Sequence, residues 1–283
     1  MNKIGKIAVI GGGHMATALI AGWSAKSRQL TSKITVAERN AAKRRHLSAK
    51  YGVKAVSSQA ALPPDAEFVL LAVKPADIST VCGVVTQKKA TIISVAAGVS
   101  VRALASGMPF KPRQIIRVMP NTPFALGAGM SVCYGAPVKA AVKSQVTELL
   151  EYGGSVLWAK KESMLEAVTA VSGSGPAYLY YFAEAMEKSA CKMGFTSSAA
   201  RRLVVQTIFG GGEMLVKSGK SAESLREAVS VPGGTTERAI AVMQHRKLSA
   251  IVAEAMRACQ TRAEEIARVS EPPRSRKSKK SGK

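Results

Sequence analysis

Short apolar runs alternate with longer mixed segments through the first half of the chain. From Lys6 to about Trp158, each run of β-branched and aliphatic residues is followed by a segment of helical composition. This alternation is typical of βαβ units around a parallel sheet, whose central strands are almost continuously apolar because helices cover both faces. The predicted strands are Lys6–Ile10, Lys33–Ala37, Glu67–Val73, Thr91–Val95, Gln114–Met119 and Met130–Tyr134.

The segments between these runs predict helices, because their apolar residues recur at helical spacing. The last two strands flank a short connection, Gly127-Ala128-Gly129, which allows them to pair antiparallel. The predicted helices of this half are Met15–Ser24, Ala41–Tyr51, Ala76–Gln87 and Val138–Tyr152.

Beyond Trp158 the strand pattern stops, and helices separated by Gly and Pro follow. Thr196–Lys217 is apolar over so wide an arc that it needs a partner subunit, so we expect a dimer or a larger oligomer of dimers. The predicted helices are Glu162–Val171, Ala177–Met193, Thr196–Lys217, Ala222–Val229 and two more between Glu237 and about Val269.

Three regions follow from these patterns. Residues 1–161 form an α/β domain, residues 162–269 form an all-α helical bundle for the substrate and for dimerisation, and residues 270–283 form a basic tail. The tail lacks apolar residues to bury, so we predict that it is disordered.

Composition and charge narrow the class of protein. The chain has 47% hydrophobic residues, as globular proteins do, and a net charge of +23, which favours anionic ligands. The positive residues are spread along the chain and only 5% of residues are aromatic, so we expect no specific nucleic-acid partner. No apolar run is long enough for a signal peptide or a membrane span, which predicts a cytoplasmic protein without a membrane partner.

The cysteines and histidines suggest no metal chemistry. No two cysteines have the Cys-x-x-Cys spacing and no two histidines are four residues apart, so we predict buried, reduced thiols and no metal site. The residues concerned are Cys82, Cys133, Cys191, Cys259, His14, His46 and His245.

A glycine-rich turn joins the first strand to the first helix. In Gly11-Gly12-Gly13-His14-Met15-Ala16, Gly11 permits the tight turn, Gly13 allows a pyrophosphate to approach, and Ala16 keeps the helix close to the sheet. The N–H groups of Gly13, His14 and Met15 lie at the helix N-terminus, which favours anions. Strand, turn and helix together indicate a Rossmann-type domain that binds a dinucleotide.

The end of the second strand bears on the choice of cofactor. Glu38 is suited to hydrogen-bond an adenosine ribose and to repel a 2′-phosphate, whereas Arg39 is suited to stack on adenine or pair with that phosphate. The positive field favours NADPH, and NADH stays open as the alternative.

Two further loops follow strands at the edge where ligands of such sheets bind. Ala72-Val73-Lys74-Pro75 and Asn121, which stands in Pro120-Asn121-Thr122-Pro123, are the candidates for the nicotinamide end. A solvated surface lysine at position 74 and a turn-forming asparagine at position 121 are the simpler alternatives.

These motifs resemble the Δ1-pyrroline-5-carboxylate reductase family over residues 5 to 265. The most specific stretch is residues 222–244, around Pro232-Gly233-Gly234-Thr235-Thr236, and Ser172-Gly-Ser-Gly-Pro-Ala-Tyr178 follows the family pattern too. The resemblance implies hydride transfer from NAD(P)H to the C=N carbon of 1-pyrroline-5-carboxylate, the last step of proline biosynthesis. It also implies that this loop holds the substrate near a dimer interface, with Thr236 close to the imine.

The residue types of the loop agree with that role. The Gly233 and Gly234 N–H groups and the Thr235 and Thr236 hydroxyls suit a small carboxylate, although a Pro-Gly-Gly turn in which Thr235 caps a helix is the simpler alternative. Val231 stands where the family usually has Ser or Thr, so one hydroxyl for the substrate carboxylate is missing.

Other functions stay open on the sequence alone. They are a related imine or β-hydroxyacid oxidoreductase, and a non-catalytic cofactor-binding protein with a basic interaction surface.

Overall fold

The computed structural model describes residues 4–270, which divide into two compact units. One unit combines the chain up to Ser174 with the segment from Cys259 onward, and the other is Gly175–Ala258. The predicted disordered tail, apart from Ser270, lies outside the described residues.

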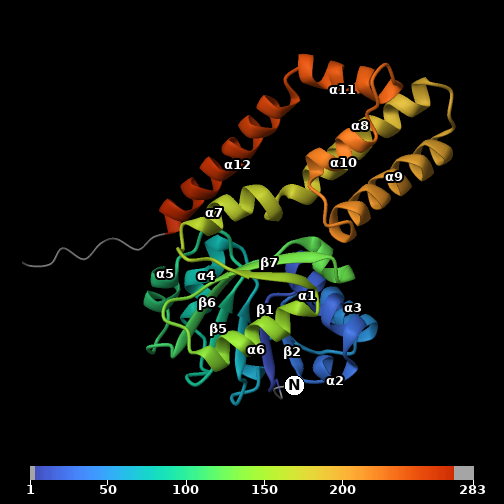
Figure 1. The fold of residues 1–283 in the computed structure, drawn as a ribbon. Coiled ribbons are helices and arrows are strands. Elements are labelled where there is room, and N and C mark those ends of the chain that lie inside the picture. Colours follow the sequence, from blue (N-terminus) through green and yellow to red (C-terminus); the bar gives the residue numbers. More distant parts are fainter. Residues whose placement is uncertain (1–3, 271–283) are drawn as a thin grey trace, which may run out of the picture. The chain divides into compact units, whose positions relative to one another are not determined.

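The first unit is built on an eight-stranded sheet with the order β3-β2-β1-β4-β5-β6-β7-β8 (Figure 1). The strands from β3 to β6 in this order pair in parallel, β7 pairs antiparallel with β6, and β8 pairs parallel with β7. The predicted Rossmann-type sheet and its antiparallel pair are confirmed. The bounds are β1 Ile7–Ile10, β2 Ile34–Ala37, β3 Lys54–Val56, β4 Phe68–Leu71, β5 Thr91–Ser94, β6 Gln114–Met119, β7 Gly129–Tyr134 and β8 Gly154–Trp158.

Helices cover both faces of this sheet, as the apolar strands require. On one face, α1, α2, α3 and α6 bury strand residues such as Val9 and Phe68; on the other, α4 and α5 bury Ala8 and Val69. The bounds are α1 His14–Lys26, α2 Arg28–Thr31, α3 Ala41–Tyr51, α4 Ile78–Cys82, α5 Val101–Ser106 and α6 Ala140–Glu151. The predicted helix Ala76–Gln87 was too long, because Gly83 and the β-branched Val84 and Val85 follow α4.

A buried ion network attaches the next helix, α7 (Met164–Val168), to the sheet. Arg117 on β6, with a side chain 4% exposed, donates to Glu162 at 2.9 Å and to Glu166 at 3.1 Å. The helix continues as a π-helix, Thr169–Gly173, up to the end of the first unit. The first compact unit thus ends at Ser174, thirteen residues after the domain boundary predicted at residue 161. The division of the chain into domains after residue 161 stays a prediction.

The second unit is helical throughout. It contains α8 (Gly175–Lys192), α9 (Ser197–Lys217), α10 (Ala222–Ala228), α11 (Thr235–His245) and the start of α12 (Leu248–Ser270). Helices α8 and α9 run side by side (Figure 1). Large apolar side chains on them are open in the single chain, among them Tyr181 at 76% and Val216 at 81% exposure, as expected of helices that associate with a second subunit.

The cysteines depart in part from the prediction of buried thiols. Cys82 and Cys133 are buried, and burial raises the pKa of the Cys82 thiol to about 11 and that of Cys133 to about 12. Cys191 is exposed and Cys259 is half-buried in the single chain. Within residues 4–270, no helix is long and apolar enough to cross a membrane.

Candidate functional site

The turn after β1 lies where the strand order reverses. On one side of β1 the chain continues to β2, and on the other side β1 pairs with β4. Gly11 has a φ of +98°, and its N–H donates to the Ala37 carbonyl oxygen at 2.9 Å. A Cβ on Gly11 would lie 2.5 Å from the Ala72 carbonyl oxygen. Both its conformation and its packing therefore require glycine at this position.

Gly13 is different, because neither requirement applies to it. Its φ of −74° and ψ of −174° suit any residue, and a Cβ there would meet no protein atom within 4 Å. Gly13 is the N-cap of α1, where no side chain caps the helix and no acidic residue lies in the first turn. A glycine that keeps this open space clear suits a site where an anionic ligand approaches the helix N-terminus.

The three residues after Gly13 begin α1. His14 is exposed and Met15 half-buried in the first turn of α1, whereas Ala16 is completely buried against the sheet. The small Ala16 side chain lets α1 lie close to the strands, which brings its N–H groups to the edge of the sheet.

Glu38, at the end of β2, holds this turn in place, and the sequence analysis missed that contact. One carboxylate oxygen accepts from the Gly12 N–H at 2.9 Å and the other from the Asn40 N–H at 2.8 Å. Burial by itself raises the Glu38 pKa. The two hydrogen bonds and the charges of Lys43 and Arg39 together lower it by more, so the pKa lies below its usual range. Glu38 is therefore an anion at neutral pH whose two oxygens each face an N–H group.

The predicted Ala72–Pro75 loop lies beside the glycine-rich turn. Strands β1 and β4 are neighbours with Ile10 opposite Leu71, and the Ala72 N–H donates to the Ile10 carbonyl oxygen at 2.9 Å. The structure thus brings together two segments that are far apart in the sequence. Lys74 is exposed and precedes a short 3₁₀-helix that begins at Pro75.

Asn121, by contrast, follows β6, which is separated from β4 by β5. Its side-chain oxygen accepts from the Met130 N–H at 2.8 Å, and its side-chain nitrogen donates to the Ser172 carbonyl oxygen at 3.0 Å. The residue is 7% exposed. An asparagine amide has two N–H groups, so one remains for a ligand after these two bonds.

The predicted substrate loop, Val231–Thr236, leads into α11 in the second unit, and its last two residues are the first two of that helix. Gly233 has a φ of +73°, and its N–H donates to a Glu237 carboxylate oxygen at 2.7 Å. The Gly234 N–H donates to the Val231 carbonyl oxygen at 3.0 Å. Both N–H groups that the sequence analysis assigned to a carboxylate are therefore used inside the loop.

The start of α11 leaves other donors open. Its N-cap is Gly234 without a side-chain cap, so the interpretation of Thr235 as the capping residue is wrong. The N–H groups in the first turn of a helix have no partner within the helix, which leaves those of Thr235 and Thr236 available with their hydroxyl groups. Thr235 is exposed and Thr236 half-buried, and Val231 is 61% exposed.

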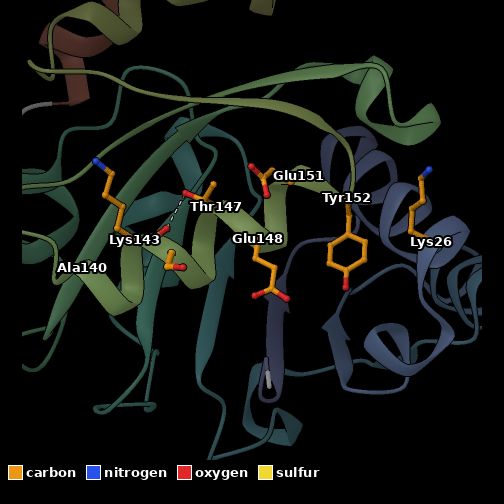
Figure 2. A pocket seen from close by; sticks show the side chains of 8 residues that line it. Lys26, Ala140, Lys143, Thr147, Glu148, Glu151 and Tyr152 are labelled. Atoms are coloured by element: carbon orange, nitrogen blue, oxygen red, sulfur yellow. Dashed lines mark hydrogen bonds between the residues drawn. The ribbon is translucent and has the colours of Figure 1, made fainter. Parts of the chain in front are cut away.

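A broad hollow of about 970 Å³ on the first unit lies elsewhere (Figure 2). None of the predicted site residues lines it. Its polar side chains come from α6 and the end of α1, and its lining residues are Lys26, Ala140, Lys143, Ser144, Thr147, Glu148, Glu151 and Tyr152. Across the described part of the chain, no group of three or more His, Cys, Asp or Glu residues is arranged to hold a metal ion.

Comparison with known proteins covers both halves of the chain. A family model described as pyrroline-5-carboxylate reductase dimerisation matches residues 162–266, and a model described as NADP oxidoreductase, coenzyme F420-dependent, matches residues 6–98. The glycine-rich turn falls in the second match and the Val231–Thr236 loop in the first.

Individual relatives are similar over nearly the whole length. The pyrroline-5-carboxylate reductase of Pasteurella multocida is 39% identical over 269 residues, which cover 92% of this chain and 97% of that protein. The solved pyrroline-5-carboxylate reductase of Coxiella burnetii is 32% identical, with a TM-score of 0.84 over 94% of this chain and 99% of that one. The pyrroline carboxylate reductase of Plasmodium falciparum, solved with NADP bound, is 25% identical, with a TM-score of 0.82 over the same shares.

Proposed function

This chain belongs to the pyrroline-5-carboxylate reductase family, and from that premise we propose that it reduces 1-pyrroline-5-carboxylate to L-proline, the last step of proline biosynthesis, with NADPH as the hydride donor. The enzyme is thus an NADPH-dependent oxidoreductase with a Rossmann-type domain and a helical dimerisation domain. The observation that carries the cofactor assignment is the open space beside Gly13. Neither the backbone conformation nor the packing at this position requires a glycine.

The turn residues are proposed to hold the pyrophosphate. Gly11 shapes the turn, Gly13 clears the approach, and the N–H groups of His14 and Met15 offer donors to the phosphate oxygens, while Ala16 fixes the helix. When bound, the reduced cofactor supplies a hydride to the substrate. The residues of this chain bind and orient both molecules.

Arg39 is proposed to bind the 2′-phosphate that distinguishes NADPH from NADH. It is exposed beside the first turn of α3, where Asn40 is the N-cap and no acidic residue lies in the turn. The negative charge of Glu38 is directed to the N–H groups of Gly12 and Asn40. A phosphate beside Arg39 therefore faces cationic side chains and helix N–H donors.

At the nicotinamide end, we assign the Ala72, Val73, Lys74 and Pro75 segment and the remaining N–H of Asn121. The contact between Ala72 and the glycine-rich turn supports the first assignment. The two bonds that fix the Asn121 side chain support a rigid donor in the second.

The Val231–Thr236 loop is proposed to hold the substrate. The Thr235 and Thr236 N–H groups bind its carboxylate at the start of α11, and the Thr236 hydroxyl oxygen accepts a hydrogen bond from the N–H of the protonated imine. A protonated imine is already electrophilic, so the enzyme needs orientation and a hydrogen-bond partner rather than a strong acid. Gly233 and Gly234 shape the loop, and Val231 places an apolar side chain beside it.

Self-association follows from the dimerisation family model and the open apolar surface of α8 and α9. We propose a dimer or a larger oligomer of dimers, located in the cytoplasm, without a specific nucleic-acid or membrane partner. The family-model match that begins at residue 162 supports a domain boundary after residue 161.

One observation favours a second candidate, a related imine reductase. The exposed Val231 offers no hydroxyl to a substrate carboxylate. Oxidation of NADPH, followed by absorbance, with 1-pyrroline-5-carboxylate and with carboxylate-free 1-pyrroline as the rival substrate tests both functions. The proposed function predicts a kcat/KM at least tenfold higher for the carboxylate substrate. The rival substrate lacks at least one charged contact, and a loss of about 1.4 kcal/mol corresponds to a factor of ten. Equal or reversed preference would show that the second candidate is correct.

A further inference from the structure

The loop that precedes α11 is closed from within by a carboxylate. Glu237, the third residue of the helix, reaches back, and one of its oxygens accepts from the Gly233 N–H at 2.7 Å. Glutamate three residues after the N-cap commonly accepts from the N–H of the N-cap itself, whereas Glu237 accepts from Gly233, one residue before the N-cap Gly234.

This bond acts on the one residue of the turn with a left-handed conformation. Gly233 has a φ of +73°, and glycine at such a position is also free to adopt many other conformations. The bond to Glu237 favours the conformation seen here, and the bond from the Gly234 N–H to the Val231 carbonyl oxygen closes the same turn. The turn in this form leaves the Thr235 and Thr236 N–H groups as the open donors.

We propose that Glu237 is a positioning residue for the substrate carboxylate, an inference that rests on the proposed function of this loop. Glu237 does not bind the substrate, since two carboxylates repel each other. It holds Gly233 so that the Thr235 and Thr236 donors are oriented before the substrate arrives. Preorganised donors bind more tightly because less loop entropy is lost on binding.

Two variants separate the hydrogen bond from the charge. Glu237→Ala removes both, whereas Glu237→Gln removes the charge but keeps an oxygen that accepts from Gly233. The matched control is Glu223→Ala, because Glu223 is also an exposed first-turn glutamate, in α10 of the same unit, but lies outside the loop. The measurements are KM for 1-pyrroline-5-carboxylate, kcat, NADPH affinity by calorimetry and melting temperature.

We expect Glu237→Ala to raise KM about fivefold, less than loss of a direct hydrogen bond to a charged substrate group would, because Glu237 acts only through the order of the loop. In Glu237→Ala, kcat and NADPH affinity should stay within about twofold of the values of the unmodified enzyme. In Glu237→Gln and Glu223→Ala, KM should also stay within about twofold. An unchanged KM in Glu237→Ala, with a lower melting temperature, would show that Glu237 only caps the helix. A lower KM would show that it competes with the substrate for the Gly233 N–H.

A second measurement tests the bond without any substrate. Amide hydrogen exchange of Gly233, followed by NMR on selectively ¹⁵N-glycine-labelled protein, should be slow in the unmodified protein and in Glu237→Gln and at least several-fold faster in Glu237→Ala. Equal exchange in all three proteins overturns the inference even if the enzyme reduces 1-pyrroline-5-carboxylate. If the unmodified enzyme does not reduce that substrate, the proposed function fails instead, whatever the exchange rates.

Discussion

The carboxylate of Glu38 accepts a hydrogen bond from the N–H of Gly12 at 2.9 Å, so the end of the second strand fixes the turn that follows the first. The other carboxylate oxygen accepts from Asn40, the N-cap of α3. One anionic side chain thereby joins the turn proposed to bind the pyrophosphate to the loop assigned to the adenosine end. The contact gives Glu38 a role that does not depend on which dinucleotide is bound.

Replacement of Glu38 by Ala should therefore weaken NADPH and NADH to a similar extent. We expect the Kd of each to rise about tenfold, because the Gly12 peptide loses an acceptor that is worth about 1.5–3 kcal/mol when charged, and part of the turn geometry remains. Isothermal titration calorimetry with both cofactors measures this. A change in the ratio of the two Kd values by more than tenfold would mean that Glu38 acts mainly as a ribose ligand.

Gly13→Val should strongly weaken cofactor binding but leave the fold intact. The added side chain meets no protein atom near its Cβ and needs no unusual φ, yet it occupies the space assigned to the pyrophosphate. We expect a Kd for NADPH raised by at least 100-fold, equivalent to about 2.7 kcal/mol, and a melting temperature only slightly lowered, because valine is a poorer N-cap than glycine. The same substitution at Gly83, where a Cβ makes only ordinary contacts, is the control. Unreduced NADPH affinity in a folded Gly13→Val protein would place the cofactor elsewhere.

The strands inside the sheet could be predicted from sequence, and the edge strands could not. The six predicted strands include all those buried on both faces, which makes their apolar runs continuous. The missed strands are β3, with three residues, and β8, which begins at Gly154 and alternates half-buried with exposed residues. An edge strand buries too little to leave a clear apolar pattern.

The same contrast applies to the candidate site. Gly11 and Gly13 were predictable, because only small residues suit a tight turn and a close ligand approach. The inward-facing roles of Glu38 and Asn121 depend on which segments become neighbours in three dimensions, and local sequence does not give that. The contact between Glu237 and Gly233 is local, but the pattern of glutamate three residues after the N-cap predicts a bond from Gly234 and misses the observed donor by one residue.

Arg117 should matter for stability more than any surface cation. Replacement by Met leaves the buried Glu166 carboxylate without its partner, which typically costs about 3–5 kcal/mol. Urea denaturation should show that loss in the free energy of unfolding, with partial recovery when Glu166→Gln is added. Lys6→Met, which breaks the exposed Lys6–Asp65 pair, is the control, with an expected loss below about 1 kcal/mol. Equal stability of the two single variants would contradict the role given to the buried network.

Thr236→Ala tests the hydrogen bond to the imine. A hydrogen bond to a charged group contributes about 1.5–3 kcal/mol, so kcat/KM should fall roughly 10- to 150-fold. NADPH affinity should not change, because Thr236 lies outside the cofactor turn. Steady-state kinetics at saturating NADPH, with calorimetry for the cofactor, measure both. A loss of less than about twofold would remove Thr236 from the reaction.

Val231→Ser tests the residue that most distinguishes this loop from the family pattern. Val231 is 61% exposed, and its backbone oxygen accepts from Gly234, a bond that serine keeps, so the substitution should leave the turn intact. If the carboxylate of 1-pyrroline-5-carboxylate lies beside residue 231, a serine hydroxyl adds one hydrogen bond of about 1 kcal/mol and lowers KM about fivefold. The control is Val231→Ala, which removes the apolar side chain without adding a donor and should not lower KM. Loss of activity in the serine variant, together with a preference of the unmodified enzyme for 1-pyrroline, would instead make Val231 an apolar wall that selects an imine without a carboxylate.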